Sequence, residues 1–499
     1  MFLNFDLGFD LRYLHCLLLS IALPNGKIQT MKEIVRVRFA PSPTGIPHIG
    51  NTRTALFNWL FARQKGGQFI VRLEDTDRKR YRPEAEEKIL EILEFLGLNW
   101  DEGPKIGGPY GPYFQSQRLE LYRQTAEELV QKGAAYYCFC SPQRLENLRK
   151  EQKEKGQIPR YDRHCLFLPK KEIEEKKRAG RYVIRLKIPD NKVFSWQDLI
   201  QGEVRINAKE VDDQVLLKSD GFPTYHLAVV VDDHLMKISY VFRGVEWISS
   251  VPKHLALYEA LGWDAPKMAH LPLILGPDRT KLSKRHGAKS VLDYRDEGYL
   301  KEALINFMAY LGWSYKDNAQ LLSLEELRRV FNLKSVQKQN AIFDIKKLDW
   351  FNGQYIRMKS NEELVNLLKP FAPKEASEEI LAKIIPLIKE RIIKLSDFQS
   401  LAGFFFKRPK LTPSLFKDKN YKNYLEKAVE TLQSIKVWNE PEITNALMAL
   451  IEKNGWKTGD FFMALRIAIT GSSFTPPIND SMAILGRKET LLRLKLAAK

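Results

Sequence analysis

The stretch Arg38-Phe-Ala-Pro-Ser-Pro-Thr-Gly-Ile-Pro-His-Ile-Gly-Asn51 decides how this sequence folds. Around its start, apolar residues alternate with arginines over Val35–Phe39, and a period of two predicts a strand. The two prolines and the glycine of Pro41–Gly45 cannot continue that strand, so a loop must follow. A helix is predicted from about His48, with apolar residues on one face, and Gly66-Gly67 closes it.

The alternation of strands and helices continues beyond this stretch. Phe69–Val71 predicts a second strand that runs into Glu74-Asp-Thr-Asp77, and a helix is predicted from Pro83 to Gly97. This order is typical of a parallel sheet that binds a nucleotide at its carboxyl edge. The apolar run Leu227–Val231 predicts another buried parallel strand. We interpret Asp232-Asp-His234, at its end, as a wall of that site rather than as a metal site.

The rest of the chain divides by pattern. Between Arg118 and Tyr225, charged helical segments accompany short strands such as Val183–Leu186, which predicts an α+β domain inserted between two halves of the sheet. After about Ser290 helical periodicity dominates. We therefore predict a Rossmann-type α/β domain over residues 31–117 and 226–277, an inserted α+β domain over 118–225, a connecting module over 278–360 and an all-α region over 361–499.

Composition limits the class of protein. With 499 residues, 44% of them hydrophobic, the chain is long enough for about three domains, and extensive disorder is excluded. Four cysteines exclude a disulfide-stapled secreted scaffold and indicate a reducing compartment, so a cytoplasmic location is expected. The formal charge of +18 favours a polyanionic partner, with nucleic acid first, over ordinary basic background.

The N-terminus imitates a targeting segment. Its most apolar stretch, Leu14–Leu23, is about half as long as a membrane span requires, so no membrane association is expected. Asp6 and Asp10 give the preceding residues the wrong charge for a secretory or mitochondrial leader. We interpret residues 1–30 as a non-native leader, with Met31 as the true start.

Two short segments carry the signals for chemistry. Pro47–Asn51 begins a helix after the first strand, where free backbone N–H groups attract phosphate, His48 adds a donor and Gly50 allows close approach. Taken alone, this histidine is more simply a helix cap. Lys281-Leu-Ser-Lys-Arg285 is the second segment, and taken alone it is a solvated basic loop. The two in this order are far more specific than either one.

The pair resembles the HIGH and KMSKS signatures of class I aminoacyl-tRNA synthetases. The finer resemblance is to bacterial glutamyl-tRNA synthetases, and it runs from Met31 to the C-terminus, ending with Ala483–Gly486. The blocks that carry it, in the order of that family, are Arg38–Asn51, Arg72-Leu-Glu-Asp-Thr-Asp77, Lys218-Ser-Asp-Gly-Phe-Pro-Thr-Tyr-His226, Val231-Asp-Asp-His234 and Lys281-Leu-Ser-Lys-Arg-His-Gly287.

The resemblance implies ATP-dependent ligation of L-glutamate to the 3′-terminal adenosine of tRNA(Glu) through a glutamyl-adenylate. Charge develops on phosphate oxygens, so catalysis needs placed cations and donors. His48 and Lys284 would stabilise that charge, and Lys281 the departing pyrophosphate. Magnesium would accompany ATP without a dedicated protein cage. The ATP-binding residues implied are His48, Gly50, Asn51, Lys281, Ser283, Lys284 and Arg285.

The resemblance also implies how glutamate is held. Arginine suits a carboxylate because its planar fork pairs with both oxygens, and Arg38 and Arg243 match the arginines of the family. Val245 departs from the family, where an acid is usual, although Glu246 remains. The glutamate-binding residues implied are Arg38, Ala40, Ser42, Glu74, Tyr225 and Arg243, with Glu74 facing the substrate ammonium.

By the same resemblance, residues 118–225 would bind the tRNA acceptor end, 278–360 would contact the stem, and 361–499 would bind the anticodon. Charging of tRNA(Gln) as well as tRNA(Glu) stays open, and we expect a monomer. Glutaminyl-tRNA synthetase resembles the chain less, because it reads the anticodon with β-barrels. The paralogue that glutamylates queuosine would lack the region beyond about Leu311. A silent tRNA-binding module would not need the two signature segments.

The inserted region contains a candidate zinc site. Cys138-Phe-Cys140 is followed by Cys165, a pattern shared with zinc-binding members of the family. Their fourth ligand is a histidine at the position of Phe167, whereas the queuosine paralogue uses a tyrosine placed as Tyr161 is here. Tyr161 is therefore the fourth candidate, and His164 is less suitable because adjacent residues rarely share a metal. The alternative is three buried, inert thiols.

Overall fold

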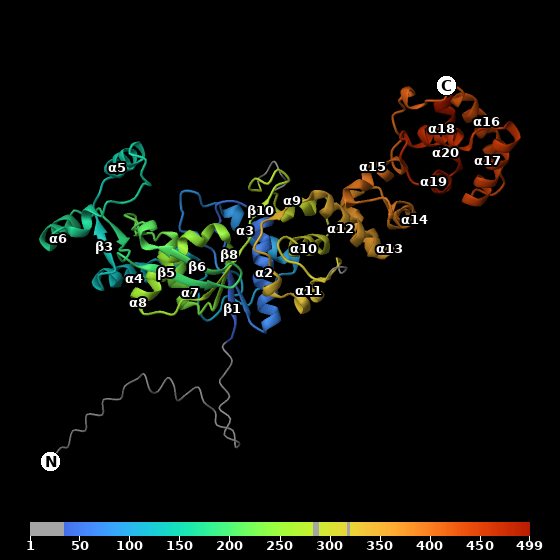
Figure 1. Ribbon diagram of the computed structural model, residues 1–499. Coiled ribbons are helices and arrows are strands. Elements are labelled where there is room, and N and C mark those ends of the chain that lie inside the picture. Colours follow the sequence, from blue (N-terminus) through green and yellow to red (C-terminus); the bar gives the residue numbers. More distant parts are fainter. Residues whose placement is uncertain (1–33, 283–288, 317–319) are drawn as a thin grey trace, which may run out of the picture.

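The fold, seen in a computed structural model, is elongated, with a parallel sheet between an inserted region at one end and a group of helices at the other (Figure 1). The structure describes residues 34–282, 289–316 and 320–499. The predicted leader at 1–30 lies outside the described residues, as do Ser283, Lys284 and Arg285.

The parallel sheet has four strands among the described residues. They are β1 (Arg36–Phe39), β2 (Gln68–Val71), β8 (Tyr240–Gly244) and β9 (Lys267–Leu271), in the order β2-β1-β8-β9. All neighbouring pairs are parallel. Strand β2 pairs with one edge of β1, and β8, which comes much later in the sequence, pairs with the other edge. In such sheets ligands bind at the carboxyl ends of the strands, in the crevice where the order of strands reverses.

The first helices are those that the sequence predicts. Helix α2 (Ile49–Lys65) has His48 as its N-cap and ends at Gly66, whose φ of 63° lies in the left-handed region. Helix α3 (Pro83–Leu96) begins with proline and ends at Gly97. Local caps and stops therefore set both helices, as the sequence indicates.

The predicted strand at 227–231 is wrong. These residues lie in helix α7 (Tyr225–Leu235), and the later strands of the sheet are β8 and β9 instead. Every residue from Leu227 to Asp233 is buried, so the apolar run Leu227–Val231 has no exposed polar face to give it an amphipathic pattern. Such a run fits a buried strand and a buried helix equally, and tertiary packing overrode the strand preference of its valines.

An antiparallel sheet forms between β2 and β8 in the sequence. It joins β3 (Ala135–Cys138), β4 (Val183–Leu186) and β7 (Val215–Leu217), and β4 is the short strand that the sequence predicts. Helix α4 (Leu119–Gln131) packs on this sheet, and Tyr122 and Leu129 share a core with α7. Helices α5 (Pro142–Glu154) and α6 (Lys170–Arg178) bury no residue.

A hairpin from the same region reaches the parallel sheet. Strands β5 (Val193–Asp198) and β6 (Gly202–Asn207) pair with each other, and the turn between them docks against β9. There the backbone N–H of Leu199 donates to the carbonyl of Met268 at 2.8 Å. The hairpin therefore links the inserted region to the last strand of the sheet.

Beyond β9, α10 (Lys301–Ala309) packs against α2, and Phe307 and Trp313 are buried in the core of the parallel sheet. That core continues through the next helices as far as Ala402. The other elements in this part are β10 (Ile274–Leu275), α9 (Val291–Asp296), α11 (Leu324–Val330), β11 (Ala341–Ile342), α12 (Ile345–Met358), α13 (Asn361–Leu368), α14 (Glu378–Ile388) and α15 (Phe398–Ala402). Helix α8 (Val251–Leu261) precedes β9 and packs against α7.

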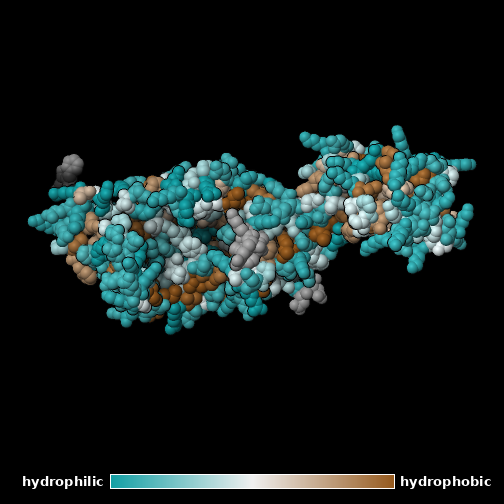
Figure 2. Space-filling model, turned by 90° about the horizontal axis from the view of Figure 1, so that it is seen from above, coloured by the Kyte–Doolittle hydropathy of each residue, from teal (hydrophilic) through white to brown (hydrophobic). Residues whose placement is uncertain are grey.

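The last five helices have a hydrophobic core of their own, which includes Leu432, Phe461 and Leu494. They are α16 (Tyr421–Ser434), α17 (Glu440–Asn454), α18 (Thr458–Thr470), α19 (Ile478–Leu485) and α20 (Arg487–Ala498), and α18 ends at Gly471. The C-terminal region is helical, which confirms the fold class. Hydrophilic side chains cover most of the face in Figure 2. No helix among the described residues has the length and apolarity to cross a membrane.

Candidate functional site

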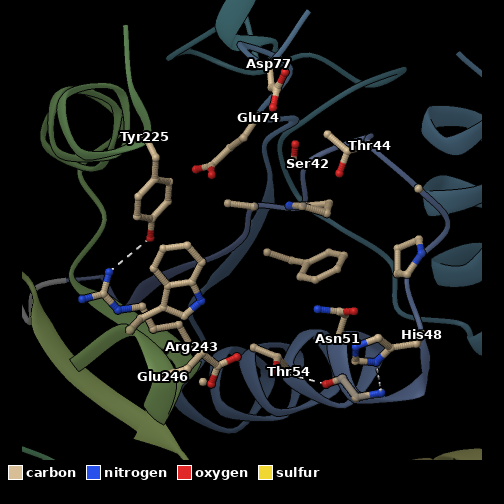
Figure 3. Close-up of a pocket in the computed structure, with 18 of the residues that line it drawn as sticks. Ser42, Thr44, His48, Asn51, Thr54, Glu74, Asp77, Tyr225, Arg243 and Glu246 are labelled. Atoms are coloured by element: carbon tan, nitrogen blue, oxygen red, sulfur yellow. Dashed lines mark hydrogen bonds between the residues drawn. The ribbon is translucent and has the colours of Figure 1, made fainter. Parts of the chain in front are cut away.

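A cavity of about 1020 Å³ opens at the carboxyl edge of the parallel sheet. Side chains from β1, the start of α2, the start of α7 and the end of β8 face one another across it (Figure 3). The structure brings together every predicted ATP- and glutamate-binding residue that it describes: Arg38, Ala40, Ser42, His48, Gly50, Asn51, Glu74, Tyr225, Arg243 and Lys281.

His48 both caps α2 and lines the cavity. Its Nδ1 accepts a hydrogen bond from the backbone N–H of Gly50 at 3.0 Å. Burial lowers the pKa of His48, and the charge of Lys281 lowers it further, so the ring is neutral at pH 7. Because Nδ1 accepts, Nε2 carries the proton and is a donor. Gly50 is required here, since a Cβ would lie 2.8 Å from the His48 ring.

Residues just after the second signature segment contact the first segment through the backbone. The N–H of Ile49 donates to the carbonyl of Lys289 at 3.0 Å, and His48 pairs with Ser290 as an isolated bridge. Lys281 is held by a turn in which the N–H of Leu282 donates to the carbonyl of Ile274 at 3.1 Å. Lys281 and Leu282, at the start of the basic segment, line the same cavity as His48.

A network of buried charges surrounds Arg38. Its Nε donates to Oδ1 of Asp233 at 3.1 Å, and Nη1 of Arg72 donates to the same carboxylate at 2.8 Å. Nη2 of Arg72 also donates to Glu74 at 3.1 Å. Burial raises the pKa of Glu74, although Arg72 and Arg38 oppose the change. Asp232, Asp233 and His234 do not line the cavity, so the predicted wall is wrong. Asp233 is a buried partner of Arg38 within α7, and not a residue at a strand end.

Arg243 lies across the cavity from Glu74, at the end of β8 (Figure 3). Its Nη1 donates to the hydroxyl of Tyr225 at 3.2 Å, and its Nε donates to Nε2 of His270 at 3.0 Å. Its Nη2 is buried and has no hydrogen-bond partner among the described residues. A guanidinium held in this way can bind a carboxylate from the cavity.

The residues at the rim of the cavity show why position 245 can lack the acid that is usual in the family. Glu246 and Trp247 line the cavity, whereas Val245 does not. Trp247 contacts the ring of Tyr225, with ring centroids 4.6 Å apart. The acid that the sequence retains is therefore the one that faces the cavity, and the missing acid is outside it.

Sequence reasoning missed residues that act through others. The sequence predicts Asp233 at the end of a strand, whereas it lies in α7 and binds Arg38. His270 has no local pattern, because its partner Arg243 is on another strand. Arg53 lines the cavity and is fully buried, with its guanidinium bound to the carbonyls of Leu311 and Pro272. Only an unusual arginine within an apolar helical stretch could have indicated it.

The three cysteines of the inserted region also come together. Their sulfur atoms lie within 4.8 Å of one another, and the Tyr161 hydroxyl lies 3.4 Å from Cys138 Sγ and 3.3 Å from Cys140 Sγ. A hydrogen bond from Cys165 lowers the pKa of Cys138 to about 4. Phe167 is 81% exposed and points to no metal role. Three thiols and one phenol in this arrangement fit a tetrahedral zinc ion.

At one end, then, the cavity offers two buried arginines beside an acidic group. At the other end it offers a helix N-terminus, a histidine donor and Lys281. The first end suits an amino acid that has a second carboxylate in its side chain, and the second end suits phosphate. The arrangement can therefore hold an amino acid and a nucleotide side by side, in reach of each other.

Comparisons with known proteins agree with this arrangement. A family profile described as "tRNA synthetases class I (E and Q), catalytic domain" matches residues 34–350, and one described as "Anticodon binding domain" matches residues 363–498. A glutamate–tRNA ligase of Treponema denticola is 44% identical, covering 93% of this chain and 99% of the relative. Another, of Dehalococcoides mccartyi, is 48% identical, covering 94% and 98%.

Solved structures give the same result. The crystal structure of a glutamate tRNA ligase from Elizabethkingia meningosepticum in complex with its amino acid has a TM-score of 0.85 to this chain at 38% identity. The match covers 93% of this chain and 99% of that one. The likeness thus extends over the catalytic part and the helical region together.

Proposed function

The chain belongs to the class I tRNA synthetases for glutamate and glutamine, as an enzyme that charges tRNA with glutamate, and we propose that the cavity at the carboxyl edge of its sheet is where glutamate is activated. The family uses ATP with magnesium. The observation that carries the proposal is Arg243, whose Nη2 is buried without a partner among the described residues in a cavity shared with the signature histidine.

Two steps follow from the chemistry. In the first, an oxygen of the glutamate α-carboxylate attacks the α-phosphorus of ATP, and the bond to pyrophosphate breaks. His48 Nε2 and the N-terminus of α2 stabilise the charge on the phosphate oxygens, and Lys281 that on the pyrophosphate. From the sequence resemblance, Lys284 acts on the same phosphates. In the second step the 2′-hydroxyl of the terminal adenosine attacks the adenylate carbonyl, the bond from that carbonyl to the phosphate oxygen breaks, and AMP leaves with the hydroxyl proton.

Both the carboxylates and the ammonium group of glutamate have partners in the cavity. Arg38 and Arg243 bind carboxylate oxygens, and the Tyr225 hydroxyl and Ser42 add donors. Glu74 faces the ammonium group, and a cation at that point offsets the burial that raises the pKa of Glu74. Ala40 leaves room for the substrate backbone.

The remaining regions bind the tRNA. We assign the acceptor end to residues 118–225, the stem to 278–360 and the anticodon to 361–499, around a catalytic domain at 31–117 and 226–277. The formal charge of +18 supports a polyanionic partner along this length. We further infer a cytoplasmic location and a monomeric state. Size-exclusion chromatography with light scattering tests the oligomeric state of the purified protein.

Cys138, Cys140, Cys165 and Tyr161 would hold one zinc ion. Its contribution would be structural, since it would tie two segments of the inserted region whose helices α5 and α6 have no buried residues. The supporting observation is the convergence of three sulfurs and the phenol. The site lies on the antiparallel sheet and not in the cavity, so no chemical step passes through it.

The function is tested with separately purified glutamate and glutamine tRNAs and labelled glutamate. Glutamate attached to tRNA(Glu), and ATP–pyrophosphate exchange in the presence of that tRNA, support the proposal. No charging of tRNA(Glu) by folded enzyme contradicts it. Labelled product on tRNA(Gln) would show that the helical region accepts both anticodons.

A further inference from the structure

The two arginines of the cavity are held by different kinds of partner. Arg38 is bound to a carboxylate, that of Asp233, at 3.1 Å. Arg243 is bound only to groups without charge in the part of the chain that the structure describes: the Tyr225 hydroxyl, Nδ1 of His254 at 3.3 Å and Nε2 of His270 at 3.0 Å. The positive charge of Arg243 is therefore not offset by a carboxylate in contact with it.

The contact between Arg243 and His270 fixes a proton. Nε of an arginine always carries hydrogen, so Nε2 of His270 must be the acceptor. The remaining proton of the neutral ring is then on Nδ1, which donates to Oδ2 of Asp198 at 2.5 Å. The side chains of His270 and Asp198 are both fully buried, so water does not compete for these bonds.

Asp198 is itself fixed by the hairpin that carries it. Its Oδ1 accepts from the backbone N–H groups of Ile200 at 3.0 Å and Gln201 at 2.9 Å, and from that of His270 at 3.2 Å. The side chain of Gln201 donates to the carbonyl of His270 at 2.9 Å. The turn between β5 and β6 thus sets the position of one carboxylate, which in turn sets one tautomer of His270.

We propose that His270 and Asp198 are positioning residues for Arg243. Asp198 fixes the tautomer of His270, and His270 holds the guanidinium through an acceptor that carries no charge. Arg243 lines the cavity, has a buried Nη2 without a partner among the described residues, and keeps its full charge for a substrate carboxylate. The inference rests on the proposed function, because the carboxylate is that of glutamate.

A neutral acceptor has a consequence that an acid would not have. A carboxylate bound directly to Arg243 would offset its charge and compete with the substrate for its donors. A histidine orients the guanidinium through one hydrogen bond and leaves the attraction for an anionic side chain intact. The hairpin of the inserted region therefore contributes to the choice of amino acid without touching it.

Aminoacylation of tRNA(Glu) with labelled glutamate tests the inference. We expect His270→Ala to raise KM for glutamate about 10- to 100-fold, since one hydrogen bond to a charged group is lost. KM for ATP should stay within about twofold of wild type, because His270 does not face the phosphate end. His234→Ala is the matched control, because the structure does not place His234 in the site wall that the sequence predicts: it stacks on Trp263 and does not line the cavity.

Two conservative variants separate positioning from packing. The amide of His270→Gln reaches the place of Nε2 and can accept from Arg243, so KM for glutamate should recover to within about fivefold of wild type. The amide of His270→Asn reaches only the place of Nδ1, so it contacts Asp198 and should not restore KM. This pair also decides the matter if the alanine variant does not fold.

A spectroscopic measurement addresses Asp198 directly. In histidine-labelled protein, the ¹⁵N shifts of His270 should show hydrogen on Nδ1 alone. Asp198→Leu removes the acceptor for that hydrogen, so His270 should lose its fixed contact with Arg243, give a mixture of tautomers and raise KM for glutamate. The inference is overturned if wild type charges tRNA normally and His270→Ala leaves KM for glutamate within about twofold, or if Asn restores it as well as Gln. If wild type does not charge glutamate at all, the proposed function fails instead.

Discussion

Removing the carboxylate of Asp233 should destabilise the centre of the protein strongly. In Asp233→Ala, Arg38 loses its carboxylate partner, and Arg72 keeps only Glu74 at 3.1 Å and Asp232 at 3.7 Å. The side chains of Arg38 and Arg72 are 5% and 0% exposed, so water cannot replace the lost partner. Breaking a buried ion pair from one side costs about 3–5 kcal/mol, and we expect that loss in the free energy of unfolding.

Urea-induced unfolding, followed by tryptophan fluorescence and circular dichroism, measures this loss. Glu151→Ala is the matched control, because Glu151 pairs with Lys155 at the surface, where both side chains are about 60% exposed. The control should leave the urea midpoint unchanged. A loss below about 1 kcal/mol in Asp233→Ala would refute the argument, because it would mean that the buried arginines need no counter-charge.

The same carboxylate predicts the direction of a pH effect. Burial alone would raise the pKa of Asp233, but Arg38 and Arg72 outweigh it and lower that pKa. Since the folded-state pKa is depressed, the stabilisation is complete above about pH 3.9, the ordinary value for Asp, and is lost as the pH falls below it. The difference in stability between wild type and Asp233→Ala should therefore shrink below about pH 4.

Three other changes test the remaining assignments. Lys284→Ala should slow charging about a hundredfold, by loss of charge stabilisation at the phosphates, with nearly unchanged affinity for tRNA; a normal rate would make Lys284 an ordinary surface residue. Deletion of residues 1–30 should leave folding and charging unchanged, and a large loss of active protein would make the leader structural. Protein purified without chelator should contain about one zinc per chain, lost in Cys140→Ser; substoichiometric zinc that the change does not affect would remove the site.

Much of the fold could be predicted because its signals are local. The alternation in β1, the prolines after it, and the glycines that end α2 and α3 are each set by neighbours in the sequence. Helix α7 could not be recognised in this way, since it is buried on all sides. The strands that replaced it, β8 and β9, are short and carry polar residues that only the fold explains.

The residues of the candidate site also differ in whether a local pattern reveals them. Residues inside a motif, such as His48 and Lys281, could be found because the motif itself specifies their spacing. The partners that hold the site lie far apart in the sequence: Arg38 and Asp233 are 195 residues apart, and Asp198 and His270 are 72 residues apart. No pattern of one chain contains such a pair, because it is created only when two elements pack.

The charges at the amino-acid end of the cavity explain why glutamate suits it better than glutamine. The buried charges here are four arginines, Arg38, Arg72, Arg118 and Arg243, and three carboxylates, those of Asp232, Asp233 and Glu74, and so one positive charge remains. Glutamate carries one net negative charge and glutamine carries none. Because the surplus charge is buried, its attraction is screened little by water, and binding a neutral amide would leave it without a counter-charge. The surplus belongs to Arg243, which is the arginine that neutral histidines hold.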